Sequence, residues 1–148
     1  MTLQERFFRP VDNSPLVLFR MIFGFLLFAE AWGAIATGWV KKAFITPDYT
    51  FPFIDFPWLQ PLPGYSMYAY YIIMGIAGLL VMLGFYYRWA IGIYAVMWAG
   101  VYFMQKTNYN NHYYLLMLLN FMMWMVPANQ YGSLDAKRNA DVRSLTCP

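Results

Sequence analysis

The sequence predicts an all-α membrane protein with about four transmembrane helices and a proline- and aromatic-rich interfacial segment between the first and the second. Its 148 residues are 61% hydrophobic and 22% aromatic but only 11% charged, whereas a soluble domain carries about a quarter charged residues. The apolar residues form long runs. The basic residues are scattered and form no stripe, which argues against nucleic-acid binding despite the net charge of +3. At this length we expect a single membrane domain.

The first predicted span covers residues 15–39 and follows a polar N-terminal segment, residues 1–14. The run Asp12-Asn13-Ser14-Pro15 is typical of a helix start, because a capping residue precedes a proline at the first helical position. A helix of this length can cross a hydrocarbon core of ~30 Å with some tilt. Apolar character continues to Val40, so we expect an uncleaved membrane helix and not a signal peptide.

Two ionisable residues lie inside this span, and both are costly in lipid. We expect Arg20, near the start, to extend its guanidinium to the lipid headgroups. Glu30 lies deeper. It is either protonated, paired inside the bundle with Lys41, Lys42 or Arg88, or turned toward a polar cavity.

Residues 43–64 separate the first and second spans and have an unusual composition. Prolines at positions 47, 52, 57, 61 and 63 exclude a continuous helix. The many aromatic residues favour the membrane–water interface over free solvent. Two interpretations remain open: a membrane-surface anchor, or a lid over a site.

The remaining spans are predicted at residues 65–87, 89–104 and 111–126, which completes a transmembrane domain over residues 15–127. Pro127 ends the last span, and residues 128–148 form a polar C-terminal tail. We expect Asn120, in the middle of the last span, to make a hydrogen bond between helices.

The basic residues predict the orientation of these spans. One side holds Arg6, Arg9, Arg88, Lys137, Arg138 and Arg143, and the other holds Lys41, Lys42 and Lys106. Because the first side holds more basic residues, we expect that side, with the N- and C-termini, to be cytoplasmic. We expect the chain to lie in an inner, plasma or endoplasmic-reticulum-like membrane. The last two spans are each about 16 residues, or about 24 Å of helix. This is shorter than the hydrocarbon core, so we expect their connection to be drawn into the outer half of the membrane.

The most polar run inside the hydrophobic part of the chain is this connection, residues 105–115. It contains Asn110, Asn111 and His112, the sole histidine of the sequence. A neutral imidazole could accept a proton from a hydroxyl group or donate a hydrogen bond to an oxyanion. Either asparagine could orient the ring or contact the same ligand. Alternatively, an asparagine caps the last span and His112 bonds to loop carbonyls.

The residue types exclude several kinds of site. One histidine without a cysteine cluster predicts no metal site and no haem held by two histidines of this chain. The sequence contains no Ser–His–Asp set, no phosphate-binding glycine loop and no paired cysteines. From the residues alone, the interpretation ends at a four-span membrane protein with a polar site on the outer side.

Four separated motifs, in the right order, carry a resemblance to a known family. They are Arg20-Met-Ile-Phe-Gly-Phe25, Met82-Leu-Gly-Phe-Tyr-Tyr-Arg88, Lys106-Thr-Asn-Tyr-Asn-Asn-His-Tyr-Tyr-Leu115 and Ala128-Asn-Gln-Tyr-Gly-Ser-Leu-Asp135. The chain resembles the N-terminal membrane portion of the vitamin K-dependent γ-glutamyl carboxylases, which belong to the HTTM (horizontally transferred transmembrane) family. The third motif, with its Asn-Asn-His, is the most specific.

The resemblance implies a reaction and a site. In the family, a reduced quinone (vitamin K hydroquinone) reacts with oxygen, and the strong base so formed removes a proton from glutamate before CO₂ adds. The resemblance implies that His112 assists the oxygenation as a catalytic residue. It also implies that Asn111 beside it belongs to the quinone site, to which we add Asn110. The implied cofactor is a reduced quinone, with no metal or haem within this chain.

Two departures limit what the resemblance implies. The family's catalytic lysine, later membrane helices and lumenal domain lie beyond the matched region, and Gln130 replaces a family histidine. We therefore expect half of a quinol-binding site that is not catalytic alone, which leaves enzyme activity uncertain. Three interpretations stay open: part of a carboxylase-like enzyme completed by another membrane chain, an accessory subunit of a larger membrane complex, or a structural module that keeps the motif for packing.

Overall fold

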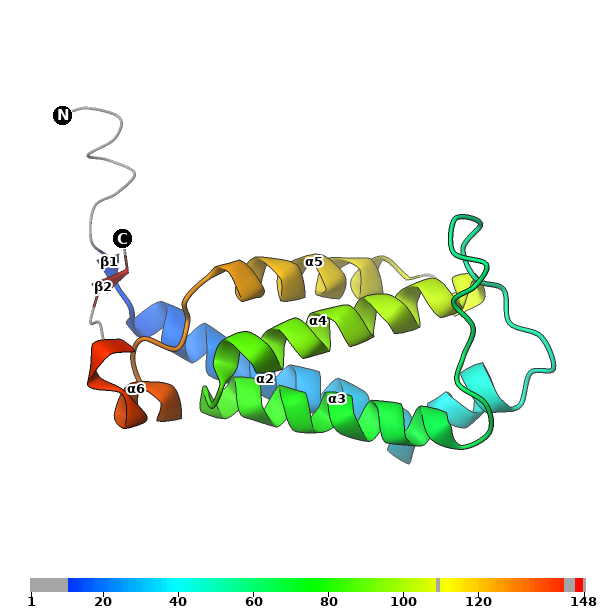
Figure 1. Ribbon diagram of the computed structural model, residues 1–148, viewed down its shortest axis with the longest axis horizontal. Coiled ribbons are helices and arrows are strands. Elements are labelled where there is room, and N and C mark those ends of the chain that lie inside the picture. The colour runs from blue at the N-terminus through cyan, green and yellow to red at the C-terminus, as the bar shows by residue number, and fades with distance from the viewer. Residues whose placement is uncertain (1–10, 109, 143–145, 148) are drawn as a thin grey trace, which may run out of the picture.

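A computed structural model of the chain describes residues 11–108, 110–142 and 146–147. The described chain is a bundle of long helices, α2 to α5, with short elements at its ends (Figure 1). The long helices are α2 (Ser14–Ala36), α3 (Ser66–Leu83), α4 (Tyr87–Met104) and α5 (Asn111–Met125). The short elements are β1 (Val11–Asp12), η1 (Lys41–Ile45), η2 (Lys106–Asn108), α6 (Leu134–Arg138), η3 (Ala140–Val142) and β2 (Thr146–Cys147).

In the described part of the chain, two helices are long and apolar enough to cross a membrane. They are α2, with a mean hydropathy of 1.7, and α3, with 1.8. The all-α class predicted from the sequence is therefore confirmed, and the two apolar helices indicate a membrane protein. Helices α4 and α5 occupy the other two predicted ranges, but their crossing of a membrane stays a prediction.

The helices pack in chain order, α2 on α3, α3 on α4 and α4 on α5. Glycines set the close approach of the first pair. A Cβ atom on Gly24 would come within 2.3 Å of the Met82 backbone nitrogen, and one on Gly78 within 2.7 Å of the Phe28 nitrogen. Small residues allow helices to approach at this distance in lipid. Helix α2 also contacts α4, because the Tyr94 hydroxyl donates to the Leu27 carbonyl at 3.0 Å, so the four helices form a bundle and not a flat layer.

The bundle has two distinct ends, on the left and right of Figure 1. The terminal end contains the start of α2, the α3–α4 turn and α6, and there β1 pairs antiparallel with β2, Val11 opposite Cys147. The loop end contains the segment 43–64 and the connection from α4 to α5. The residues after α5 fold back onto the terminal end, where the Asp135 backbone nitrogen donates to the Gly84 carbonyl at 3.0 Å.

The segment 43–64 continues without a helix after η1 and is fastened to the end of α4. The buried Gln105 amide donates to the Ala43 carbonyl at 3.3 Å and accepts from the Phe51 backbone nitrogen at 2.9 Å. The Phe53 backbone nitrogen donates to the Phe103 carbonyl at 3.2 Å. Many large side chains of this segment stay exposed, among them Tyr49, Phe51, Ile54 and Trp58. An interfacial anchor would present such a surface.

Candidate functional site

The Asn-Asn-His stretch forms the first turn of α5 at the loop end. Asn110 is the N-cap, and its Oδ1 accepts from the His112 backbone nitrogen at 2.9 Å. The same oxygen lies 2.7 Å from Nδ1 of the His112 ring. An amide oxygen only accepts, so this contact requires a proton on Nδ1, and in the neutral ring that tautomer has its lone pair on Nε2. Asn110 therefore caps the helix and orients the imidazole at once.

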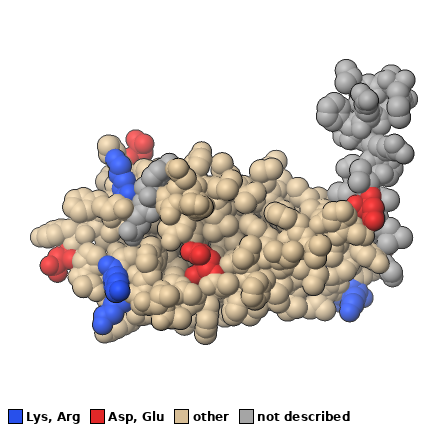
Figure 2. Space-filling model, turned by 180° about the vertical axis from the view of Figure 1, so that it is seen from behind, with Lys and Arg blue, Asp and Glu red and all other residues tan. Residues whose placement is uncertain are grey.

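His112 and Glu30 line the same cavity, whose walls come from helices α2 and α5. The cavity has a volume of about 290 Å³, and its other walls are apolar. The residues that line it are Leu26, Glu30, His112, Tyr113, Leu115, Leu116 and Leu119. Seen from the side of α2, Figure 2 shows acidic atoms at a hollow part-way along the bundle, while basic groups gather at the ends.

Helical spacing explains this lining. Leu26 and Glu30 are four residues apart on α2 and share one face. On α5, His112, Leu116 and Leu119 follow at intervals of four and three and share another. The two faces meet across the cavity, so a carboxyl from one helix and an imidazole from the other border one apolar space.

A second cavity of about 200 Å³ adjoins the first, because Glu30 and Tyr113 line both. Its remaining walls are Ala29, Gly33, Ala34, Thr37 and Trp39. The Tyr113 ring is held edge-on by Trp39 at 6.3 Å and Trp98 at 5.4 Å, between ring centroids. Trp98 also donates from Nε1 to the Tyr113 carbonyl at 3.1 Å. Sequence reasoning missed Tyr113, although its place directly after His112 is the signal that could have identified it.

The structure corrects two of the predictions for buried polar residues. Asn120 is 0% exposed, but its amide nitrogen donates to the Leu116 carbonyl of its own helix at 2.9 Å, so the predicted bond between helices is wrong. Its Oδ1 is buried and has no hydrogen-bond partner among the residues that the structure describes. A helix carbonyl four residues earlier is the nearest acceptor for such a side chain. Asn111 is exposed at the start of α5.

Arg20 does not extend to the headgroups, so that prediction is also wrong. It is 1% exposed and donates from Nη1 to the Ala128 carbonyl at 3.2 Å and from Nη2 to the Gly132 carbonyl at 2.9 Å. A Cβ atom on Gly84 would lie 2.3 Å from Nη1, so the glycine leaves space for the guanidinium. The returning C-terminal segment supplies the acceptors that lipid headgroups were expected to supply.

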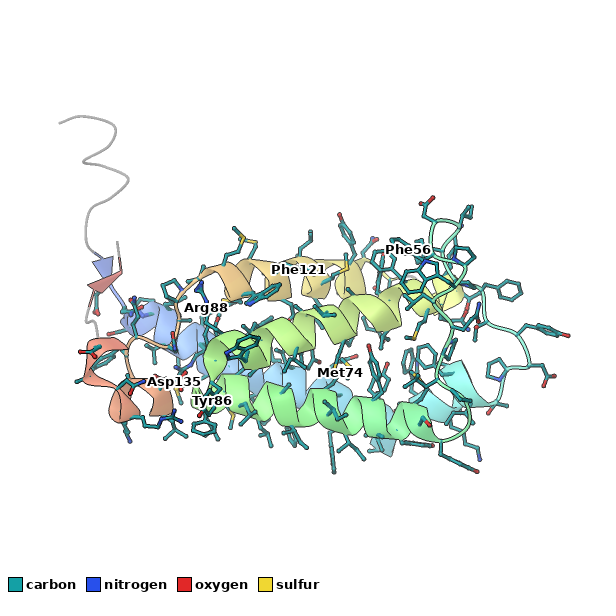
Figure 3. All side chains as sticks on the ribbon, viewed as in Figure 1. Phe56, Met74, Tyr86, Arg88, Phe121 and Asp135 are labelled. Carbon is teal, nitrogen blue, oxygen red and sulfur yellow. The ribbon has the colours of Figure 1, made fainter. Side chains whose placement is uncertain are left out.

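Asp135 completes this second polar cluster at the terminal end. Its carboxylate accepts from the Tyr86 and Tyr87 backbone nitrogens at 2.8 and 3.0 Å and from the Asn129 side chain at 3.0 Å. Figure 3 shows Tyr86, Arg88 and Asp135 together at this end. A carboxylate at the first N–H groups of α4 is favourable both as a cap and toward the helix dipole.

The four sequence motifs thus divide between the two ends. Those that begin at Arg20, Met82 and Ala128 meet in the terminal cluster, where they join α2, the α3–α4 turn and the C-terminal segment. The motif with His112 lies at the loop end and borders the cavity. The motifs that begin at Arg20, Met82 and Ala128 therefore hold the fold together, and the motif with His112 borders the cavity. Among the described residues, no group of three or more His, Cys, Asp or Glu could hold a metal ion.

Comparison with known proteins assigns this arrangement to a family. No solved structure matches the chain. The HTTM domain matches residues 8–148, nearly the whole sequence. This range includes both polar clusters and all four long helices. The protein is therefore a member of the HTTM domain family.

Proposed function

We propose that this chain is a membrane module that supplies half of a quinol-binding site and resembles the N-terminal part of a vitamin K-dependent γ-carboxylase. The observation that carries the proposal is that His112 and Glu30 border one apolar cavity between α2 and α5. Asn110 holds the imidazole through Nδ1, so that in the neutral ring Nε2 is the nitrogen that can accept a proton. Alone, the module does not complete the reaction.

The residues of the cavity fit a reduced quinone. Ligand sites typically have volumes of about 300–1,000 Å³ with apolar walls and a few polar groups. The main cavity of about 290 Å³ is continuous in its lining with a second of about 200 Å³, which together suit a flat ring and the start of an apolar tail. When bound, a quinol supplies acidic hydroxyl groups and two electrons for reaction with oxygen.

The side chains of this chain have defined roles in the proposal. His112 Nε2 accepts a hydroxyl proton, Asn110 holds the ring through Nδ1, and Tyr113 lines both cavities. Glu30 receives a second hydrogen bond or faces a cation on the partner. The leucines exclude water, which would quench a strong base.

This chain binds the quinol, but the reaction needs another chain, because the site is open toward the outside of the bundle. His112 is exposed, and residues 43–64 line neither cavity that Glu30 borders. A helix of a partner chain, carrying the lysine that the resemblance implies, fits between α2 and α5. In the proposed topology four helices cross the membrane, the terminal end is cytoplasmic, and the loop end with Lys41, Lys42 and Lys106 is on the outer side.

The second candidate function is a non-catalytic accessory or structural subunit of a larger membrane complex. One observation favours it: Asn110 already satisfies the His112 backbone nitrogen and ring as a helix cap. In that case a partner helix packs against the surface between α2 and α5, and the cavity holds only apolar side chains or lipid. The two candidates differ in whether a quinol binds.

The test measures binding of a reduced naphthoquinone with a short isoprenoid tail to the full chain in lipid nanodiscs, under a reductant that keeps it reduced. Quenching of tryptophan fluorescence reports occupancy, since Trp39 lines the second cavity. We expect His112→Ala to weaken binding roughly tenfold, the equivalent of one good hydrogen bond, and Glu30→Gln to weaken it less.

Asp55→Asn is the matched control, because Asp55 is an exposed acid outside both cavities. It should leave quinol binding unchanged. If the wild-type chain binds no quinol, or if both site variants bind as well as wild type while their unfolding is unchanged, the quinol-site function is wrong and the accessory-subunit function is preferred.

A further inference from the structure

A groove on the outside of the bundle, away from the quinol cavity, runs along α4 from Arg88. It lies between α4 and α5 and has a volume of about 320 Å³. Its lining residues are Arg88, Trp89, Gly92, Ile93, Val96, Met97 and Trp124. Apart from the one guanidinium at its mouth, the groove is apolar.

The groove is shaped by a missing side chain. Gly92 is buried, because the Trp124 indole from α5 packs directly over its backbone. A Cβ atom on Gly92 would come within 2.8 Å of that ring. The indole forms one wall, and Ile93 and Val96, both exposed on α4, extend the surface along the helix. Together these residues form an apolar groove along the outer surface of the bundle.

The length of the groove matches one leaflet of a bilayer. Arg88 and Met97 are nine positions apart in α4, which is about 13.5 Å at the α-helical rise. Half of a hydrocarbon core of ~30 Å is about 15 Å. Trp89, beside the mouth, is 74% exposed, and exposed tryptophan is typical of the headgroup level. An acyl chain that begins at the Arg88 end reaches the mid-plane where the groove ends.

The charge at the mouth favours an anion. The Arg88 guanidinium is exposed. A second cation lies nearby, because Arg138 stacks over the Tyr86 ring at 4.7 Å. Asp135, an acid at the same end of the bundle, accepts hydrogen bonds from the Tyr86 and Tyr87 backbone nitrogens and from the Asn129 side chain. By the basic-residue bias this end is cytoplasmic, and the cytoplasmic leaflet is the one that carries anionic lipids.

We propose that this groove binds one anionic phospholipid of the cytoplasmic leaflet, with its phosphate at Arg88 and one acyl chain along Gly92, Ile93 and Val96. The inference rests on the proposed crossing of the membrane by α4 and is independent of the quinol site. Arg supplies paired donors that match phosphate oxygens. The groove thus fixes one lipid at the seam between α4 and α5.

The experiment measures tryptophan quenching of the full chain in nanodiscs that contain brominated lipid, either phosphatidylglycerol or phosphatidylcholine. We expect the wild type to prefer the anionic lipid about fivefold, the equivalent of one interfacial arginine. Arg88→Gln should abolish the preference, and Arg88→Lys should retain most of it. Val96→Phe should reduce quenching by both lipids, because the larger side chain fills the groove without adding a tryptophan.

Two control variants match these changes. Lys42→Gln removes a cation at the opposite end, and Ile76→Phe places the same phenyl ring at an exposed position of α3. Both should leave the preference unchanged. The proposal is overturned if Arg88→Gln keeps the preference, if Lys42→Gln abolishes it equally, or if inorganic phosphate alone displaces the lipid. Quinol binding should be the same in wild type and Arg88→Gln, so failure of this proposal is distinguishable from failure of the quinol site.

Discussion

Arg20 and Gly132 are 112 residues apart in the sequence, and Nη2 of the arginine donates a 2.9 Å hydrogen bond to the carbonyl of the glycine. The same guanidinium bonds to Ala128. An arginine near the start of the first helix therefore fastens the segment that follows the last one. This contact closes the terminal end of the bundle and makes residues 128–139 part of the fold.

Arg20→Met should destabilise the protein. It leaves two carbonyl groups, on Ala128 and Gly132, without their donor in a buried site, and hydrogen bonds to a charged group contribute about 1.5–3 kcal/mol. Arg20→Lys should recover only part of this, because an ammonium cannot reproduce the planar pair of donors. SDS-induced unfolding in mixed micelles measures the change. Exposed Lys42→Met is the control, and an effect as large there would contradict the role of Arg20.

Gly84→Ala should disturb the same cluster from the other side. Gly84 has a φ of +64°, and an added Cβ would lie 2.3 Å from Arg20 Nη1 and 2.5 Å from Ser133 Cβ. Gly38 has a similar φ of +72° with nothing within 4 Å, so Gly38→Ala measures the backbone strain alone, about 1–2 kcal/mol. We expect Gly84→Ala to cost more by about 1–3 kcal/mol of overpacking. Equal losses in the two variants would show that the Arg20 site tolerates the methyl group.

Asn110 should influence both helix stability and quinol binding. Asn110→Ala removes the cap of α5, for a loss of about 1 kcal/mol, and it frees the His112 ring. Asn110→Asp keeps an acceptor for the His112 backbone nitrogen and for Nδ1, so it should preserve stability. Thermal unfolding and quinol titration of the two variants separate the effects. Full quinol binding by Asn110→Ala would show that the orientation of the ring is unimportant.

Gln105 should control the attachment of the segment 43–64. Gln105→Leu has a similar size but cannot bond to the Ala43 carbonyl or the Phe51 nitrogen. We expect faster proteolytic cleavage between residues 46 and 64, and the helices themselves should remain intact. Limited proteolysis followed by mass spectrometry measures this. Gln60→Leu is the matched control, because Gln60 is exposed and its side chain bonds within the segment, to Thr50 and Pro57, so it tests internal bonds without the attachment to α4. A cleavage rate equal to that of wild type in Gln105→Leu would contradict the prediction.

Asp12 should make the stability of the fold slightly dependent on pH, through its hydrogen bonds at the start of α2. Hydrogen bonds from the Ser14 backbone nitrogen and hydroxyl lower the pKa of the Asp12 carboxyl below its usual value. A lowered pKa in the folded state stabilises the fold above the unfolded-state pKa, and this contribution is lost as pH falls through the folded value. Ser14→Ala removes the hydroxyl bond and should raise the pKa toward the unfolded value. NMR titration of labelled aspartate measures the shift, and an unchanged pKa would show that the backbone bond suffices.

The helices themselves were predictable because their signals are local. Pro15 after polar residues marks the start of α2, and prolines 47 to 63 exclude a helix between α2 and α3. The role of Asn110 as a possible cap also follows from adjacent residues. The meeting of Glu30 with His112 was not predictable, since these residues are 82 positions apart and lie on helices that are not neighbours in the chain.

The two wrong predictions have the same physical origin. For Arg20 and Asn120, the sequence showed that a polar group in an apolar helix needs a partner, but not which partner. In a helix on the surface of a soluble protein, the polar residues mark the exposed face, and the apolar face opposite them is the buried one. Here exposed residues such as Phe19 and Ile22 are as apolar as the buried Phe23 and Leu27, so periodicity does not separate the core face from the outer face.

By itself, the sequence determined the all-α class, the position of the helices, the membrane character and the polar turn that begins α5. Composition, proline placement and capping act within a few residues, so one chain segment contains the whole signal. The tertiary structure alone decided that Arg20 binds the C-terminal segment, that Glu30 and His112 line one cavity, and that Trp124 packs over Gly92. These relations depend on which helix faces meet, and that is settled by close packing and by the partners available to each buried polar group.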